Sequence, residues 1–214
     1  MNKDALMVLS GGMDSVTMLH DFIDTIALAV YFHYGSNHER REAECARQQC
    51  AIAGVELIEI DLTFMSRHFT SALLDGADAI PDADYATDNM LATVVPFRNG
   101  IMLSVAAGLA ESRRLKAVMI ANHSGDHAVY PDCRPAFVDA MASAIRLGTY
   151  AGVELRAPYT GLSKSDIARR GKAIGVDYTL TYSCYRGGER HCGTCATCRE
   201  RRQALADAGI DIDD

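Results

Sequence analysis

Short, almost continuously apolar runs alternate with longer segments of helical spacing along most of this 214-residue chain. The runs are rich in β-branched residues and apolar at successive positions, which is typical of strands covered on both faces. They span residues 5–9, 26–32, 55–60, 117–121 and 153–156, and the helical segments span residues 15–25, 38–53, 99–113, 135–150 and 164–174. Strands that alternate with helices predict a doubly wound α/β fold around a parallel five-stranded sheet.

Polar residues follow the expected strands, and the first strand ends in Leu-Ser-Gly-Gly-Met-Asp-Ser. Gly11 and Gly12 permit a tight turn in which backbone N–H groups converge on a phosphate, and the N-terminus of the following helix adds partial positive charge. Ser10 and Ser15 add hydroxyl groups, and Asp14 either holds Mg²⁺ or caps the helix. We expect a phosphate-binding loop here. The alternative is a plain strand–turn–helix connection.

Four of the seven cysteines crowd together near the C-terminus with the spacing C-x7-C-x2-C-x2-C. Four thiolates form the tetrahedral shell that structural Zn²⁺ prefers, and they leave no position open for catalysis. An iron–sulfur cluster is the alternative. We therefore predict a zinc-binding C-terminal element, residues 178–214, after a nucleotide-binding domain of residues 1–177. The expected zinc ligands are Cys184, Cys192, Cys195 and Cys198.

Composition limits the partners of the chain. The formal net charge is −7, so the overall field does not attract a nucleic-acid backbone, and we expect small-molecule substrates. The odd number of cysteines indicates a reducing compartment. No signal peptide and no apolar stretch of the ~20 residues that span a membrane is recognised. We expect a cytoplasmic protein that binds neither nucleic acid nor membrane, with a mobile surface loop at residues 75–89.

The motif Ser-Gly-Gly-x-Asp-Ser resembles the pyrophosphate loop of the N-type ATP pyrophosphatases, whose fold is Rossmann-like. The resemblance implies that ATP is cleaved to AMP and pyrophosphate. The loop holds the β- and γ-phosphates while a substrate group attacks the α-phosphorus. The residues that the resemblance assigns to the nucleotide are Leu9, Ser10, Gly11, Gly12, Met13, Asp14, Ser15, Val16, Thr17, Met18 and Leu19.

Further blocks resemble the 7-cyano-7-deazaguanine synthase family over essentially the whole chain. They are VPFRN at 95–99, YPDCR at 130–134, PYTGLSKSDI at 158–167, SCY at 183–185 and the cysteines from 192. The resemblance implies an ATP-dependent ligase of queuosine-type precursor synthesis. ATP adenylates the carboxylate of 7-carboxy-7-deazaguanine, and ammonia displaces AMP. A second ATP then activates the amide, which loses AMP to give the nitrile. We also expect a homodimer.

Residues within these blocks receive roles from the same resemblance. Asp14, Arg98 and Lys164 are the expected catalytic residues. Arg98 neutralises phosphate or carboxylate charge, and Lys164 stabilises charge that develops on the adenylate. The expected substrate-binding residues are Asn99, Asp132 and Arg134. The alternatives are that the asparagine caps a helix and that the other two form a structural ion pair.

Three other functions remain open at this point. The first is a tRNA-modifying ATP pyrophosphatase, which would need a catalytic cysteine pair or a basic surface. The second is a non-enzymatic, zinc-bearing nucleotide-binding module, which would need neither Arg98 nor Lys164. A sibling enzyme passes the activated 7-deazaguanine to another amine, such as one on a protein. Ser36 in place of the family's glutamine and Ala136 in place of its glutamate leave room for that third function.

Overall fold

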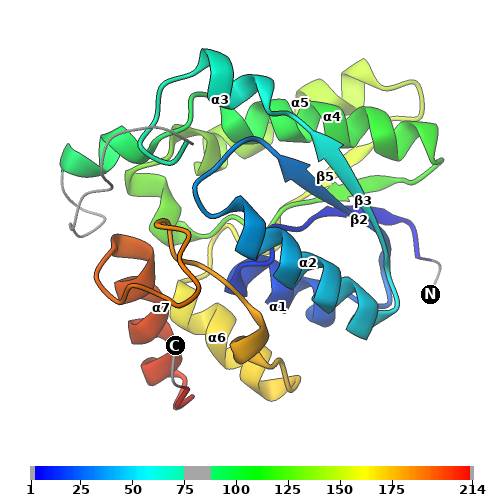
Figure 1. The fold of residues 1–214 in the computed structure, drawn as a ribbon. Coiled ribbons are helices and arrows are strands. Elements are labelled where there is room, and N and C mark those ends of the chain that lie inside the picture. Colours follow the sequence, from blue (N-terminus) through cyan, green and yellow to red (C-terminus); the bar gives the residue numbers. More distant parts are fainter. Residues whose placement is uncertain (1–2, 75–87, 213–214) are drawn as a thin grey trace.

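The computed structural model describes residues 3–74 and 88–212. Its centre is a parallel sheet in the order β3-β2-β1-β4-β5, so the chain winds outward from β1 in both directions (Figure 1). The strands are β1 (Ala5–Val8), β2 (Ile26–His33), β3 (Glu56–Asp61), β4 (Ala117–Met119) and β5 (Glu154–Arg156). The predicted fold class is confirmed, with strand ends that differ by one or two residues.

Helices cover both faces of the sheet, which explains why its strands are apolar at successive positions. On one face, Leu6 of β1 packs in a cluster with residues of α4 and α5, while Ala5 and Met7 pack on the other face with residues of α1 and α2 (Figure 1). The main helices are α1 (Met13–Asp21), α2 (Glu39–Ala53), α4 (Arg98–Ser112), α5 (Pro135–Gly148), α6 (Lys164–Ala173) and α7 (Ala196–Asp207).

Helix α7 and several short elements were not expected from the sequence. Besides α7, they are α3 (Phe64–His68) and the 3-10 helices η1 (Asp88–Thr93), η2 (Ser124–Ala128), η3 (Pro131–Cys133) and η4 (Tyr178–Leu180). The 3-10 helices are too short for a periodic pattern, and α7 is predominantly polar, so its buried face is narrow. Residues 75–87 of the expected loop lie outside the described part of the chain, and its last two residues begin η1.

One segment corrects the expectation about apolar stretches. Met90–Ser112 has the length and composition of a membrane-spanning helix, with a mean hydropathy of 1.4 over an 18-residue window. Half of that window is buried inside the protein. Its helical core, α4, packs on β1 and β4, and this contact accounts for its apolar character, as in the core helix of a globular domain.

The C-terminal residues pack closely on the rest of the fold. Leu205 of α7 shares a hydrophobic cluster with Met13 of α1, Ala168 of α6 and Tyr178. The guanidinium group of Arg201, which is fully buried, donates to the hydroxyl of Thr181 and to the carbonyl of Tyr178. The division into residues 1–177 and 178–214 stays a prediction. α7 packs against α6, which in turn packs against α1 (Figure 1).

Candidate active site

The glycine loop connects β1 to α1 and has a fixed shape. Gly11 has a φ of +81°, and a Cβ at this position would lie 2.3 Å from the Glu42 carbonyl oxygen, so only glycine fits. The Ser10 N–H donates to Ser15 Oγ at 3.2 Å, and that hydroxyl donates to the Gly12 carbonyl at 3.1 Å. These bonds hold the turn open at the N-terminus of α1, where unpaired N–H groups and the helix dipole favour an anion.

A charged cluster lies beside the loop. Lys164 Nζ, at the start of α6, is 3.3 Å from Asp14 Oδ2 and 2.7 Å from Glu200 Oε2 of α7. The lysine side chain is 8% exposed, so these two carboxylates fix its position. Asp14 Oδ1 is buried and has no hydrogen-bond partner among the described residues. The carboxylate of Asp14 is therefore ready to bind a cation or a donor that arrives with a ligand.

His123 completes the cluster and has a defined tautomer. The Gly125 N–H donates to His123 Nδ1 at 3.1 Å, so the neutral ring carries its proton on Nε2. Nε2 lies 3.7 Å from Asp14 Oδ2 and 3.6 Å from Asp126 Oδ1. Burial raises the pKa of Asp126 above its ordinary value. Two acids thus face the Nε2–H group of the histidine.

A cavity of about 210 Å³ connects Asp14, Asp126 and Lys164 of this cluster to α4. Of the residues predicted from the sequence, it is lined by Leu9, Ser10, Gly12, Asp14, Ser15, Arg98, Asn99 and Lys164. It is also lined by Tyr34 and Asn122, which follow expected strands, by Tyr130, Cys133 and Tyr185, which lie in the sequence blocks, and by Glu42, Asp126 and Thr197, which had no expected role. The predicted nucleotide segment only partly reaches the cavity, because Val16, Met18 and Leu19 pack in the core.

Two predicted substrate contacts lie outside the lining of this cavity. Asp132 Oδ2 accepts the backbone N–H of Asn99 at 2.8 Å, so it caps the first turn of α4. The Asn99 side chain donates to the Asp132 carbonyl and to Cys133 Sγ, both at 3.2 Å. The exposed Arg134 donates from Nε to the His127 carbonyl at 2.9 Å. The structure therefore brings Asn99 to the cavity and places Asp132 one contact behind it.

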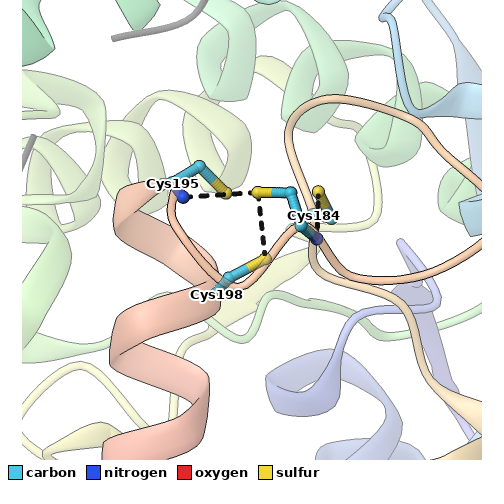
Figure 2. A group of neighbouring side chains, drawn as sticks. Cys184, Cys195 and Cys198 are labelled. Carbon is cyan, nitrogen blue, oxygen red and sulfur yellow. Dashed lines mark hydrogen bonds between the residues drawn. The ribbon is translucent and has the colours of Figure 1, made fainter. Parts of the chain in front are cut away.

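The four predicted metal ligands converge at the start of α7. All four Sγ atoms lie within 4.8 Å of one another, and Figure 2 shows those of Cys184, Cys195 and Cys198 pointing toward each other. The Sγ atoms of Cys192 and Cys198 are 3.9 Å apart, close to the ~3.8 Å edge of a tetrahedron with metal–sulfur bonds of about 2.3 Å. Backbone N–H groups of Cys192 and Cys195 point at ligand sulfurs, as expected where the sulfurs carry negative charge. This donor set fits a structural metal ion.

The sheet, the glycine loop at the carboxyl end of β1 and the cavity beside it define an α/β protein of the nucleotide-binding type. A solved structure with a similar fold is that of NMN synthetase from Francisella tularensis, with a TM-score of 0.52, 14% identity, and coverage of 99% of this chain and 79% of that one. Residues 4–209 match the family described as queuosine biosynthesis protein QueC. This chain belongs to the QueC family.

Relatives match over nearly their whole length. A 7-cyano-7-deazaguanine synthase of Porphyromonas gingivalis W83 is 56% identical over 208 residues, which are 97% of this chain and 94% of that protein. One of Desulfotalea psychrophila is 46% identical over 212 residues, which are 98% and 97% of the two chains. The resemblance found in the sequence motifs is thereby confirmed.

Proposed function

We propose that this chain converts 7-carboxy-7-deazaguanine and ammonia to 7-cyano-7-deazaguanine and cleaves ATP to AMP and pyrophosphate. One observation carries the proposal. The Ser-Gly-Gly-x-Asp-Ser loop shares its cavity with Arg98 and Lys164, so a phosphate-binding turn and two cationic side chains meet in one place. The names of the relatives supply the substrate.

The reaction has two activations of the same kind. A carboxylate oxygen attacks the α-phosphorus of ATP, and pyrophosphate leaves. Ammonia then displaces AMP, and the amide forms with loss of a proton. The amide oxygen attacks a second ATP in the same way, and loss of AMP and of both N–H protons leaves the carbon–nitrogen triple bond. Each stage turns an oxygen that leaves poorly into a phosphate ester that leaves well, so one loop serves both stages.

The side chains around the cavity divide this work. The loop N–H groups and Lys164 hold the departing pyrophosphate, where negative charge grows as the bond to the α-phosphorus breaks. Arg98 neutralises the attacking carboxylate, because a planar guanidinium group pairs with carboxylate or phosphate. His123, with its proton on Nε2 between two acids, is placed to orient Asp14.

Two metal ions belong to the proposal. Zinc is held by the four-cysteine cluster, which fills a tetrahedral shell and has a structural role. Mg²⁺ supplies positive charge to the phosphates of ATP when it is bound, and Asp14, whose Oδ1 has no partner, is the residue placed to hold it. The carboxylates of Asp126 and Glu200 add to the negative charge that favours a cation there.

We place the enzyme in the cytoplasm as a homodimer that acts on small molecules. None of the seven cysteines, all of which lie in the described residues, forms a disulfide, which suits a reducing compartment. The net charge of −7 disfavours a polynucleotide substrate. At the end of α5, Leu147 is 82% exposed and Tyr150 is fully exposed, and a second copy would cover them.

The second stage provides a direct test of the proposal. We expect the primary amide of 7-carboxy-7-deazaguanine, incubated with enzyme and Mg·ATP but no ammonium, to become the nitrile with release of AMP and pyrophosphate. Mass spectrometry of the base and chromatography of the nucleotide measure both products. ADP as the nucleotide product, or recovery of unchanged amide, would contradict the mechanism. An assay without enzyme is the control.

A further inference from the structure

A second polar group lines the cavity apart from the loop and the charged cluster. It consists of Tyr34 after β2, His38 and Glu42 at the start of α2, and Arg98 at the start of α4. The guanidinium group of Arg98 donates to the Tyr34 hydroxyl at 3.3 Å and lies over the ring of that tyrosine, 5.6 Å from its centre. The sequence reasoning assigned a role to the arginine and none to Glu42.

The Glu42 carboxylate has unused capacity to accept hydrogen bonds. The side chain of Glu42 is 13% exposed, and among the described residues it makes no hydrogen bond. Its contact with His38 joins Oε2 to Nε2 at 3.6 Å, beyond hydrogen-bond length. Burial raises the pKa of Glu42 to about 8, although Arg98 lowers it. A mostly buried carboxylate is unfavourable in its ionised form unless hydrogen-bond donors surround it. The surroundings of Glu42 therefore point to a ligand that supplies those donors.

The proposed substrate presents donors that match this acceptor. A guanine-like ring carries an N1–H and a 2-amino group side by side, and a carboxylate accepts two parallel N–H bonds in one plane. The adjacent O6 is an acceptor, and Arg98 offers N–H donors in the same group of side chains. Aromatic rings of Tyr34 and Tyr185 line the same cavity and suit the faces of a flat ring.

We propose that Glu42 determines specificity for the 2-amino-pyrimidinone edge of the substrate, with its carboxylate accepting the N1–H and one 2-amino hydrogen. The inference rests on the proposed function. The alternative role for the Glu42 side chain is that of a base, which accepts a proton from the amide nitrogen as the nitrile forms. Recognition acts on binding of the ring in the absence of ATP, whereas a proton acceptor acts on kcat alone, so the two roles separate experimentally.

The test measures binding by titration calorimetry, without turnover, for Glu42→Gln and wild type. The ligands are 7-carboxy-7-deazaguanine and the same acid without its 2-amino group. Glutamine has one acceptor and one donor where the carboxylate has two acceptors. We therefore expect the variant to bind the full acid about 10- to 100-fold more weakly, the loss of a hydrogen-bonded charge. Binding of the acid that lacks the 2-amino group should change much less, and ATP binding should be unchanged.

Glu44→Gln is the matched control, since Glu44 lies on the same helix but is 42% exposed and pairs with Arg41. It should bind both acids like wild type. Equal weakening of both acids by Glu42→Gln would overturn the proposal, and so would unchanged binding with a lowered kcat, which would identify a proton acceptor. If the wild-type protein binds ATP but neither acid, the proposed function itself fails, and that result is distinct from a failure at Glu42 alone.

Discussion

Replacement of Lys164 with methionine is expected to lower kcat by about 100- to 1,000-fold, the usual effect of removing one group that stabilises developing charge. Lys164 is buried beside Asp14 of the glycine loop, and its Nζ lies between Asp14 and Glu200. Methionine keeps most of the volume of the side chain and removes the charge. Steady-state rates of AMP release, measured with the thermal midpoint of each variant, check the prediction.

Two further variants make the Lys164 result interpretable. Lys164→Arg keeps the charge and should recover part of the activity. Lys172→Met is the matched control on the same helix, because its Nζ donates to the carbonyls of Ala208 and Gly209, away from the cavity. It should lower stability slightly and leave kcat near wild type. Wild-type kcat in Lys164→Met would show that this lysine is a structural link between α6 and α7.

Replacement of Cys195 with serine is expected to release the metal and to have the largest effect on stability. Cys195 is both a predicted ligand and the N-cap of α7, and metal binding supplies folding energy in sites of this kind. α7 also carries Thr197 to the cavity and Glu200 to Lys164, so activity should be lost together with the metal. Elemental analysis of the purified proteins, with thermal unfolding, measures both effects.

Cys50→Ala is the control for this experiment, since Cys50 is a buried thiol on α2 outside the cluster. It should keep one zinc ion per chain and lose only the small amount of stability that a modest cavity costs. Iron in the wild-type protein, together with visible absorption, would show that the four cysteines hold an iron–sulfur cluster and not zinc. A full complement of zinc in Cys195→Ser would show that another residue is the fourth ligand, and His191 is the neighbour to test next.

The parts of the site that were predictable from the sequence are those whose residues are close together in the chain. Gly11 and its neighbours form a turn that local geometry requires, and the last three cysteines bracket short turns onto one helix. The central strands β1, β2 and β4 were predictable because they are buried between helices on both faces and are therefore largely apolar, whereas the edge strands β3 and β5 carry exposed charged residues. Local pattern and tertiary structure agree at these positions.

The remaining residues reach the cavity only through tertiary structure. Both Glu42 and Glu200 are polar positions on helices that look solvated in the sequence. Glu42 lines the cavity because α2 packs beside the loop, and Glu200 contacts the cavity-lining Lys164 because α7 packs on α6. The role of Asp132 was also beyond local reasoning, because its acceptor capacity is used by a backbone N–H of α4, 33 residues away in the chain. The propensity of a residue for helix or strand carries no information about such long-range contacts.

The most direct test of the proposed reaction measures the fate of the ammonium nitrogen and of the ATP phosphates in one experiment. The wild-type protein is incubated with 7-carboxy-7-deazaguanine, ¹⁵N-ammonium and Mg·ATP, and the products are separated by mass spectrometry and nucleotide chromatography. We expect the ¹⁵N-labelled nitrile, twice as much AMP as nitrile, and pyrophosphate equal to AMP. Unchanged acid, ADP as the nucleotide product, or label-free base attached to a protein amine would contradict it.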